Sequence, residues 1–384
     1  MRNPVPPGHG WIPIAYGALD VSGSDDFAAG ADVLVLPTRP GEALCLVGEG
    51  AALWRGLIAS APAAPASFTP EENGILAHLS DLGLVTVAAS HPAQITDLQP
   101  PTLSSPLHEL VYALVARVAS HQGIACVFTK GPALRLQGLR EREHSGDVDL
   151  WCDPARLDEL ADALLPWGWD RAPDPWLGTT IHHTATLTPR RWGCEIDVHR
   201  RFPGLALDDE RAFALVLRDA VPLRFGGVDV LVPAPATHAV LAALHAVRPV
   251  IGAGPRTPAV SASARAFFSR AEGSVARARE LGAVPALRHE LEPLAEPGSL
   301  DADAAGTPRD WEWRQQPDRV RAYWMAIRAV SWPVRARLIL RFVWPPDDVA
   351  LASARHAGHP ATTPRRARWI RLGRGIRDWA RRRR

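Results

Sequence analysis

Three aspartates in the middle of the chain have the type and spacing of a site for divalent cations. Asp147 and Asp149 stand two residues apart in the segment GDVDLW, and Asp197 stands in EIDVHRRF. If both segments are β-strands, alternate side chains share a face, so the acids project together while Val148 and Leu150 point into a core. Carboxylates placed in this way can hold two Mg²⁺ ions about 4 Å apart, and such ions lower the pKa of an attacking hydroxyl.

Two more polar residues, Glu195 and His199, alternate with apolar residues around Asp197 and share its predicted face. We expect both to support the acids, and a simple hydrogen-bonding role for His199 fits the pattern as well as a catalytic one. A Gly-Asp-x-Asp segment by itself often holds only a turn acid beside a solvated strand acid. The second acidic strand favours the metal site.

A turn with the composition of a phosphate site precedes the acids. The apolar run 124–128 leads into Thr129, Lys130 and Gly131, and a helix is expected from about Pro132. Exposed amides at a helix N-terminus bind phosphate, and a lysine adds charge. Lys130 is the only lysine in the chain. These three turn residues are therefore predicted to bind the phosphates of a nucleoside triphosphate.

The elements around these residues predict an α/β fold with a mixed sheet flanked by helices. Ser105 and Pro106 mark the start of an amphipathic helix that Gly123 ends. Strands are expected at 124–128, 147–152, 184–187 and 194–198, with a helix over 154–165. Beyond Pro235 the pattern becomes helical, with helices expected over 262–282, 284–294 and 316–343.

Three other histidines are interpreted as structural. His182 and His183 begin a predicted strand, where histidines are more often structural than ligands. His245 lies in the apolar stripe of a helix after Pro235, which favours a buried histidine with a hydrogen-bond partner.

The N-terminal part predicts a small winged-helix module. Residues 32–47 read as two strands around a turn, a helix follows at 51–59, and Thr69 caps a second helix that precedes a strand at 84–87. Residues 1–92 contain three arginines and nine acids. A negative module of this kind does not suit DNA phosphates, so DNA binding is not expected. A simple packing role remains an alternative.

Composition limits the remaining possibilities. The chain has no apolar stretch long enough to span a membrane and no basic, apolar leader, so a cytoplasmic location is expected. The four cysteines have no spacing typical of zinc or disulfide frameworks. Residues 365–384 carry a net charge of +9. If the tail is helical, Trp369, Leu372, Ile376 and Trp379 share one side, and the tail could lie on an anionic membrane or contact nucleic acid or an acidic peptide. The alternative is a disordered, solvated tail.

Two resemblances add to this interpretation. The hairpin VLVLP…ALCLV, the segment GEGAALWRGLI and the ending LSDLGLVTV resemble PqqD-like winged-helix modules over about residues 10–90. This resemblance implies that a leader peptide of a precursor pairs along an exposed strand edge.

The series TKGPAL, GDVDLW and EIDVHRRF resembles the polymerase-β-type nucleotidyltransferase superfamily, in particular its uncharacterised bacterial branch, over about residues 104–250. The resemblance implies that Asp147 and Asp149 bind metal, that Asp197 is the third carboxylate, and that Gly131 is the turn glycine. Most of the superfamily has a serine after this glycine, whereas Pro132 brings neither a hydroxyl nor an amide donor.

We therefore expect a Mg²⁺-dependent nucleotidyltransferase that moves a nucleoside monophosphate from a nucleoside triphosphate to an acceptor hydroxyl, in the extended hypothesis on a ribosomally made precursor peptide. The alternatives are a non-catalytic peptide-binding adaptor with a degenerate fold and a toxin- or antitoxin-type nucleotidyltransferase acting on RNA or protein. The expected division is a winged-helix module at 1–92, a linker at 93–104, a catalytic domain at 105–235, a helical domain at 236–350 and a basic tail at 351–384.

Overall fold

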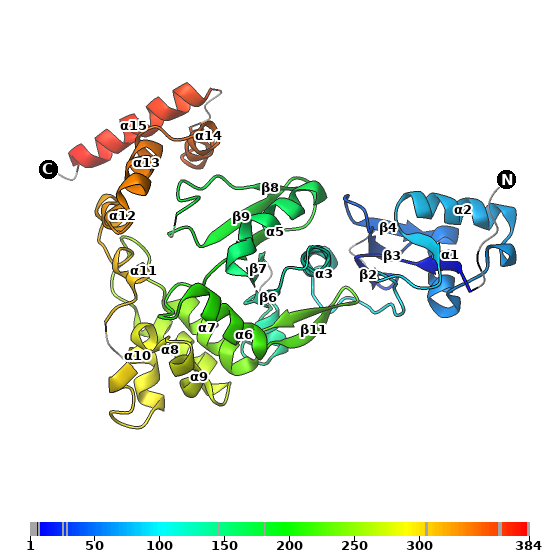
Figure 1. Cartoon of the computed structure of the whole chain (residues 1–384), viewed down its shortest axis with the longest axis horizontal. Helices are drawn as coiled ribbons and strands as arrows, with labels where there is room; N and C mark the ends of the chain where they lie inside the picture. Colours follow the sequence, from blue (N-terminus) through cyan, green and yellow to red (C-terminus); the bar gives the residue numbers. More distant parts are fainter. Residues whose placement is uncertain are drawn as a thin grey trace.

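The computed structural model describes residues 6, 8–24, 27, 30–143, 146–179, 181–303, 306–359 and 363–381. Figure 1 shows an elongated molecule with the N-terminal elements at one end, a sheet with its helices in the middle, and the C-terminal helices at the other end. The mixed α/β class predicted from the sequence is confirmed.

The N-terminal part forms two small sheets and two helices. Their bounds are β1 Gly10–Pro13, β2 Gly17–Asp20, β3 Ala31–Leu36, β4 Leu44–Val47, α1 Gly48–Ser60, α2 Pro70–Asp81 and β5 Val85–Ala88. One sheet has the order β2-β3-β4 and the other pairs β1 with β5. The Thr69 hydroxyl accepts a bond from the Glu72 amide and the Glu72 carboxylate accepts one from the Thr69 amide, so the predicted cap is confirmed.

Strand β3 is buried on both faces, which the sequence did not predict. Val33 and Val35 pack under α1 and α2, as expected. Leu34 and Leu36, on the opposite face, join the apolar core of the central sheet. Since both faces of β3 exclude water, the N-terminal elements pack firmly against the central part of the chain.

The central sheet has five strands in the order β6-β7-β10-β9-β8, and only the β7–β10 pair among these described strands is parallel. The elements are α3 Pro106–His121, β6 Cys126–Thr129, α4 Ala133–Leu136, β7 Asp147–Cys152, α5 Leu157–Leu164, β8 Trp169–Arg171, β9 Thr184–Pro189 and β10 Glu195–His199. Helices α3 and α5 cover one face, where Val148, Leu150, Ile196 and Val198 are fully buried. The other face carries the acids.

Helices from later in the chain cover the acidic face at one end. They are α6 Asp209–Arg218 and α7 Pro235–Val247, joined by the hairpin of β11 Val221–Phe225 and β12 Val228–Val232. Val127 and Trp151 of the sheet share a core with these helices. Beyond α7 lie α8 Pro258–Ser269, α9 Ser274–Glu280, α10 Val284–Leu291, α11 Arg309–Glu312, α12 Arg319–Arg328, α13 Trp332–Val343, α14 Asp347–His356 and α15 Pro364–Arg381.

Two of the long helices predicted from the sequence are broken. The segment 262–282 is divided into α8 and α9 because Gly273 adopts a left-handed φ of 78° between them. The segment 316–343 is divided into α12 and α13, since Pro333 stands in the first turn of α13 and cannot continue a preceding helix. The tail forms the helix α15, while the side chains of Ile376 and Trp379 lie outside the described residues.

Candidate active site

Asp149 and Asp197 lie directly beside each other on neighbouring parallel strands. Their Cα atoms are partners in the β7–β10 register. Asp149 is buried, with 4% of its surface exposed, and Asp197 is half-buried. The alternation that the sequence predicted is therefore confirmed, and it brings two carboxylates together at the centre of one sheet face.

Hydrogen bonds hold this pair of acids in place. The Thr186 hydroxyl on β9 donates to Oδ1 of Asp197 at 2.5 Å. Nε2 of His199 lies 2.9 Å from Oδ1 of Asp149, and Nδ1 of His199 lies 2.7 Å from the Thr184 hydroxyl. Because an ionised Asp149 can only accept, His199 donates from Nε2 to Asp149. His199 is thus a direct partner of the acid pair.

Lys130 supplies a positive charge to the same carboxylate. Its Nζ lies 2.5 Å from Oδ1 of Asp149. Burial opposes ionisation of Asp149, but the hydrogen bond and charge of His199 and the charge of Lys130 outweigh it, so the pKa of Asp149 lies well below its usual range. Asp149 is therefore an anion that accepts hydrogen bonds from both Lys130 and His199.

The turn that carries Lys130 has an unusual backbone. Lys130 has a φ of 59° and Gly131 a φ of 51°, and a left-handed conformation costs a residue with a side chain about 1 kcal/mol. The Lys130 amide donates to Nε2 of His238 at 2.7 Å, and Arg140 donates to the Gly131 carbonyl at 2.7 Å. A Cβ on Gly131 would lie 2.5 Å from the Tyr112 hydroxyl, so only glycine fits.

His238 was not singled out from the sequence. It is fully buried in α7, and its Nδ1 lies 2.6 Å from Oε1 of Gln137. Because Nε2 accepts from the Lys130 amide, Nδ1 carries the proton and donates to Gln137. Burial, with the charges of Arg140 and Lys130, lowers the pKa of His238 to about 3. A neutral histidine thus supports the Lys130 turn.

The helix expected after this turn is short. Helix α4 spans only Ala133–Leu136, so its dipole is smaller than that of a longer helix. Thr129, at the end of β6, is 1% exposed and pairs with Asp149 across the sheet. The turn therefore contributes the Lys130 side chain and its backbone, and phosphate binding by the N-terminus of the short helix stays a prediction.

Asp147 and Glu195 lie two residues before Asp149 and Asp197 on the same two strands. Their Cα atoms are partners in register, and Asp147 lines the cavity in front of the acids. Burial and the neighbouring acids, Asp197 first among them, raise the pKa of Glu195, whose side chain is exposed. The ligand atoms that lie within 4.8 Å of one another belong to Asp149, Asp197 and His199. Metal binding by Asp147 stays a prediction.

A cavity of about 330 Å³ opens in front of these residues. Besides Lys130 and the acids, its lining includes side chains from three distant segments: His182, His183, His245, Arg248, Trp313 and Arg314. Burial lowers the pKa of Arg314 to about 10 and also lowers that of Arg248, while Asp149 and Asp197 favour the charged form of Arg248. Guanidinium groups keep their charge at neutral pH, and both of these line the cavity that Asp147 and Asp197 also line.

Sequence reasoning missed most of this lining. His245 is exposed on α7 at the cavity, and not a core residue as expected. Arg248 follows His245 by three residues, a spacing that places two side chains on the same side of a helix. This spacing is the one local signal that could have linked His245 and Arg248. Trp313 and Arg314 come from a segment more than a hundred residues from β10, so the sequence around the acids does not point to them. The Arg314 guanidinium lies 4.5 Å from the Trp313 ring.

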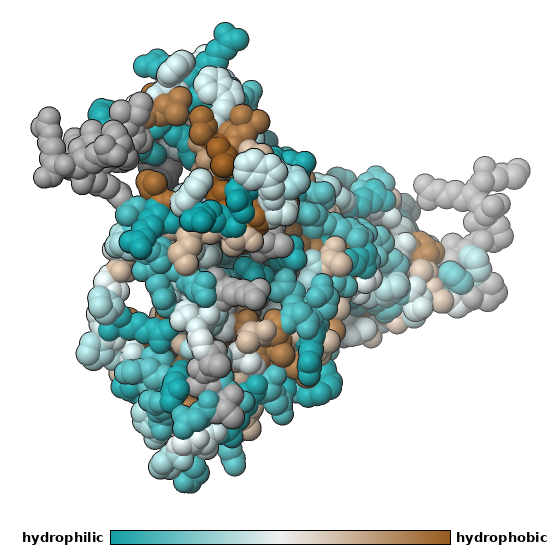
Figure 2. All heavy atoms as spheres, turned by 60° about the vertical axis from the view of Figure 1, so that its left-hand side comes forward, coloured by the Kyte–Doolittle hydropathy of each residue, from teal (hydrophilic) through white to brown (hydrophobic). Residues whose placement is uncertain are grey.

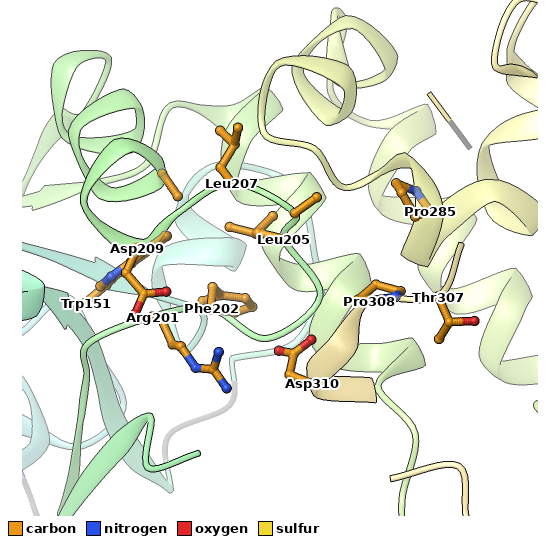
Figure 3. Close-up of a pocket in the computed structure, with 12 residues that line it drawn as sticks. Trp151, Arg201, Phe202, Leu205, Leu207, Asp209, Pro285, Thr307, Pro308 and Asp310 are labelled. Atoms are coloured by element: carbon orange, nitrogen blue, oxygen red, sulfur yellow. The ribbon is translucent and has the colours of Figure 1, made fainter. Parts of the chain in front are cut away.

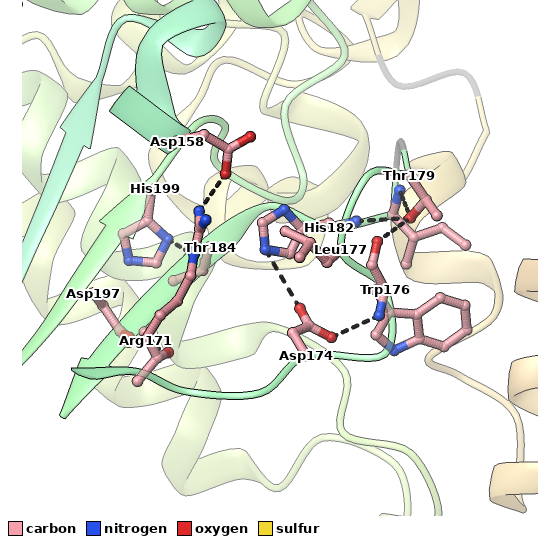
Figure 4. A network of polar contacts seen from close by, with 12 residues as sticks. Asp158, Arg171, Asp174, Trp176, Leu177, Thr179, His182, Thr184, Asp197 and His199 are labelled. Carbon is pink, nitrogen blue, oxygen red and sulfur yellow. Dashed lines mark hydrogen bonds and ion pairs between the residues drawn. The ribbon is translucent and has the colours of Figure 1, made fainter. Parts of the chain in front are cut away.

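The loop between β8 and β9 brings His182 to the cavity (Figure 4). The Thr179 hydroxyl accepts from the His182 amide at 3.4 Å and donates to the Trp176 carbonyl at 2.7 Å. Nε2 of His182 lies 3.5 Å from Oδ2 of Asp174. These contacts order the loop, and they place His182 and Asp174 in the lining of the cavity.

The donor set suits a divalent cation. Carboxylate oxygens are the ligands that Mg²⁺ and Mn²⁺ prefer, and an imidazole nitrogen is better suited to Mn²⁺ than to Mg²⁺. Among the described residues, the hydrogen bonds of Asp149 and Asp197 use Oδ1, and Oδ2 of each carboxylate takes no part in them. Each acid thus has an oxygen to offer without breaking its present bonds.

A second cavity of about 430 Å³ lies beyond the ends of β7 and β10 (Figure 3). Trp151 and Phe202 form its aromatic wall, and Arg201, Asp209 and Asp310 bring charges to it. The Phe202 ring is 6.2 Å from that of His199. The His199 ring, which bonds Asp149, therefore lies between this aromatic wall and the acid pair.

Two solved structures are similar to parts of the chain at a low level. One is an antigenic nucleotidyltransferase-like protein from Paracoccidioides brasiliensis, at 17% identity and a TM-score of 0.33, over 54% of this chain and 96% of that one. The other is the lincosamide antibiotic adenylyltransferase LnuA bound to lincomycin, at 16% identity and a TM-score of 0.27, over 42% of this chain and 96% of that one. At these TM-scores neither likeness supports a functional assignment. No curated protein matches the chain.

The segment that builds the acidic face matches a known family. The match does not reach residues 1–92, so the likeness of that part to PqqD-like modules stays a prediction. It includes β6, β7, β10 and α7, and with them Lys130, Asp149, Asp197 and His238. It confirms the expectation of an enzyme of the nucleotidyltransferase kind: residues 107–257 match the model of a family described as uncharacterised nucleotidyltransferase.

Proposed function

We propose that the chain is a nucleotidyltransferase that depends on a divalent cation and transfers a nucleoside monophosphate to an acceptor hydroxyl. The observation that carries this proposal is the in-register pair of Asp149 and Asp197 beneath a cavity that also contains Lys130, Arg248 and Arg314. Anionic groups that bind cations thus face cationic groups that bind phosphates across one small space.

Asp149 and Asp197 would hold the cation, with Asp147 as a third acid on the same face and His199 positioned to orient Asp149. The predicted number is two Mg²⁺ ions. When bound, these ions would neutralise the charge of the triphosphate and polarise the α-phosphate.

The chain's own cations would bind the triphosphate. Arg248 and Arg314 line the cavity from two different segments, so they could grip a phosphate chain from the side opposite the sheet. Lys130 now neutralises Asp149, and a metal cation at that carboxylate would repel its ammonium group. Lys130 would then be free to turn toward the β- and γ-phosphates.

The transfer step exchanges one P–O bond for another. The acceptor oxygen forms a bond to the α-phosphorus, the bond from this phosphorus to the oxygen that bridges to the β-phosphate breaks, and pyrophosphate leaves. Asp197 would help to activate the acceptor hydroxyl from the acidic side of the cavity, and the proton of that hydroxyl would pass to solvent. His199 and Lys130 keep the neighbouring Asp149 ionised.

For the acceptor we propose a precursor peptide recruited by the N-terminal elements. In the sheet β2-β3-β4, β2 is bonded outward to Gly226 and Gln99, which leaves β4 as the edge that a further strand could join. Val47 at the end of β4 is 56% exposed. A groove of about 520 Å³ between α1 and α2, lined by glutamates and apolar side chains, lies beside it and would suit a basic, partly apolar peptide.

The test is incubation of the full chain with α-labelled nucleoside triphosphates, Mg²⁺ or Mn²⁺, and the peptide encoded nearest its gene, followed by mass spectrometry. A mass gain of one nucleoside monophosphate is expected for the wild type and none for Asp149→Asn or Asp197→Asn. Asp229→Asn, on the exposed side of β12, is the matched control and should keep full activity.

Calorimetry of nucleotide and peptide binding, together with the transfer assay, separates the proposal from its alternatives. An adaptor with a degenerate site would bind the peptide without transferring a nucleotide, and both aspartate variants would then behave as the wild type does. Transfer to RNA, or to a protein other than the peptide, would keep the reaction and refute the peptide acceptor.

A further inference from the structure

The C-terminal sixth of the chain differs sharply in charge from the rest. Residues 319–384 contain 17 arginines and three aspartates, a net charge of +14, while residues 1–318 carry −12. Three aspartates cannot neutralise this many arginines, so a large surplus of positive charge gathers at one end of an elongated molecule (Figure 1).

The same region exposes apolar side chains that a folded protein ordinarily buries. Of the fourteen large hydrophobic side chains that are exposed among the described residues, eight lie between Val320 and Trp369. Figure 2 shows them as brown and white atoms gathered at the top of the molecule, over the C-terminal helices. Exposed apolar surface concentrated in this way marks an interaction site.

Helix α12 is amphipathic with its apolar face turned outward. Val320 and Trp324, one helical turn apart, are 67% and 51% exposed, and Met325 lies beside them. Arg321 and Arg328 are exposed on the same side. The opposite side of the helix, with Ala322 and Ala326, is buried in a small aromatic cluster. The outward side is therefore not needed for packing.

Helix α13 repeats this arrangement. Trp332, Ala336, Leu340 and Val343 are spaced by four, four and three residues and are all exposed, so they form a continuous stripe along one face. Arg337 flanks the stripe. The inward face packs through Phe342 on Tyr323 and Trp176, with ring centroids 5.3 and 4.8 Å apart.

Helix α15 adds a third tryptophan surface. Trp369 is 66% exposed and meets Trp344, at the end of α13, edge to face with centroids 6.4 Å apart. The Arg368 guanidinium lies 5.0 Å from the Trp344 ring. Arg365 and Arg366, at the start of the same helix, are exposed, and exposed tryptophans and arginines together are typical of surfaces that lie at the boundary of lipid headgroups and acyl chains.

We propose that the outward faces of α12, α13 and α15 form a docking surface for a bilayer that contains anionic lipids, with the helices lying on the bilayer. Arginines would bind the headgroup phosphates, and the tryptophan and aliphatic side chains would enter the upper acyl region. Among the described residues, no helix is long and apolar enough to cross a membrane, so the contact would be to the surface.

The aliphatic side chains favour lipid over nucleic acid. Tryptophan and arginine suit either partner, since bases stack on aromatic rings and phosphates bind guanidinium groups. Val320, Leu340 and Val343 have neither a ring to stack nor a charge, and they would stay exposed on a polyphosphate backbone. A second copy of the chain is also disfavoured, because a twofold dimer would bring together two regions that each carry a net charge of +14.

The contacts of α13 connect this surface to the active site. Phe342 packs on Trp176, and Arg341 donates to the Leu177 carbonyl, in the loop that carries His182 into the cavity. A bilayer held by α13 would therefore lie at a set distance from the cavity. The docking surface itself does not depend on the proposed transfer reaction.

The test is co-sedimentation of the full chain with vesicles of pure phosphatidylcholine and of phosphatidylcholine with 30% phosphatidylglycerol. Binding to the anionic vesicles is expected, with at least about tenfold weaker binding to the neutral ones, since each basic residue near an anionic surface adds about fivefold. Raising the salt from 0.1 to 0.5 M should weaken the binding, because screening shortens the reach of the charges.

Variants separate the two contributions. Trp332→Ala with Leu340→Ala, and Arg321→Glu with Arg337→Glu, should each reduce the binding to anionic vesicles by about tenfold or more. The matched controls are Val250→Ala with Leu231→Ala, and Arg211→Glu, which change exposed residues elsewhere and should leave the binding unchanged. Circular dichroism spectra would confirm that each variant is folded.

Three outcomes would overturn the proposal: equal sedimentation with neutral and anionic vesicles, tight binding of a single-stranded oligonucleotide without vesicle binding, and Trp332-dependent self-association in light scattering without vesicle binding. The second would assign the surface to nucleic acid, and the third to a second copy of the chain.

Discussion

Nε2 of His238 accepts a hydrogen bond of 2.7 Å from the backbone amide of Lys130, a residue 108 positions earlier in the chain. This bond holds Lys130 in the left-handed conformation that directs its ammonium to Asp149. A buried histidine of α7 thus determines where the lysine of the active site lies. The bond also ties the helical part of the chain to the sheet that carries the acids.

Replacing His238 by alanine should loosen the Lys130 turn. The Lys130 amide and Gln137 would lose a buried partner, which costs about 2–4 kcal/mol together with the cavity left by the ring. Thermal unfolding should show this loss, and nucleotidyl transfer should fall more than tenfold. His238→Gln should recover part of both, because its amide oxygen can still accept from Lys130. The exposed His289→Ala is the control, and an equal loss there would contradict the role of His238.

The low pKa of His238 predicts a stability that falls in acid. Its pKa is about 3 in the folded chain and about 6.5 when unfolded, so the unfolded state binds a proton first as the pH falls. Stability should be constant above about pH 7 and decrease from pH 6.5 toward pH 3, by about 5 kcal/mol at most. Urea unfolding of the wild type and His238→Gln at several pH values measures it. A slope that is identical in the two proteins would refute this assignment.

Gly131→Ala should destabilise the turn through two separate causes. The methyl group would meet the Tyr112 hydroxyl, and alanine would have to adopt a φ of 51°. Each cause is worth about 1–2 kcal/mol. In a double-mutant cycle, Tyr112→Phe should recover the steric part only, since it removes the hydroxyl but does not change the backbone. A full recovery would mean that the left-handed backbone costs nothing at this position.

Lys130→Met should change metal and nucleotide binding in opposite directions. Removing the ammonium frees Oδ1 of Asp149 from a competing cation, so Mn²⁺ alone should bind about tenfold more tightly. Binding of a nucleoside triphosphate should weaken, because a phosphate partner is lost. Calorimetry with Mn²⁺ and then with nucleotide measures both. Arg135→Met, on the adjoining short helix, is the matched control, and weaker Mn²⁺ binding to Lys130→Met would contradict the proposed competition.

Much of the sheet could be predicted from the sequence because its information is local. The alternation around Asp149 and Asp197 identified two strands and the face that the acids share, and the register confirms that face. The capping residues Thr69 and Ser105 predicted where two helices begin, since a side-chain oxygen that accepts an N-terminal amide is a property of a few adjacent residues.

Predictions that needed the length or surroundings of a helix were less accurate. The segments 262–282 and 316–343 were each expected to form one helix, and His245 was expected in the core. Helix length and helix orientation depend on what packs against each face, and the periodicity of a segment does not contain that information. The burial of both faces of β3 was not predicted for the same reason, because it depends on which parts of the chain pack against the strand.

The sequence by itself determined the acids, their common face, the lysine turn and the charge of the two ends of the chain. Only the tertiary structure decided that Lys130 neutralises Asp149, that His238 holds the turn, and that Arg248 and Arg314 face the acids. The physical reason is that each of these relationships joins residues from separate elements. Their distance is set by how helices pack on the sheet, which is a property of the whole core.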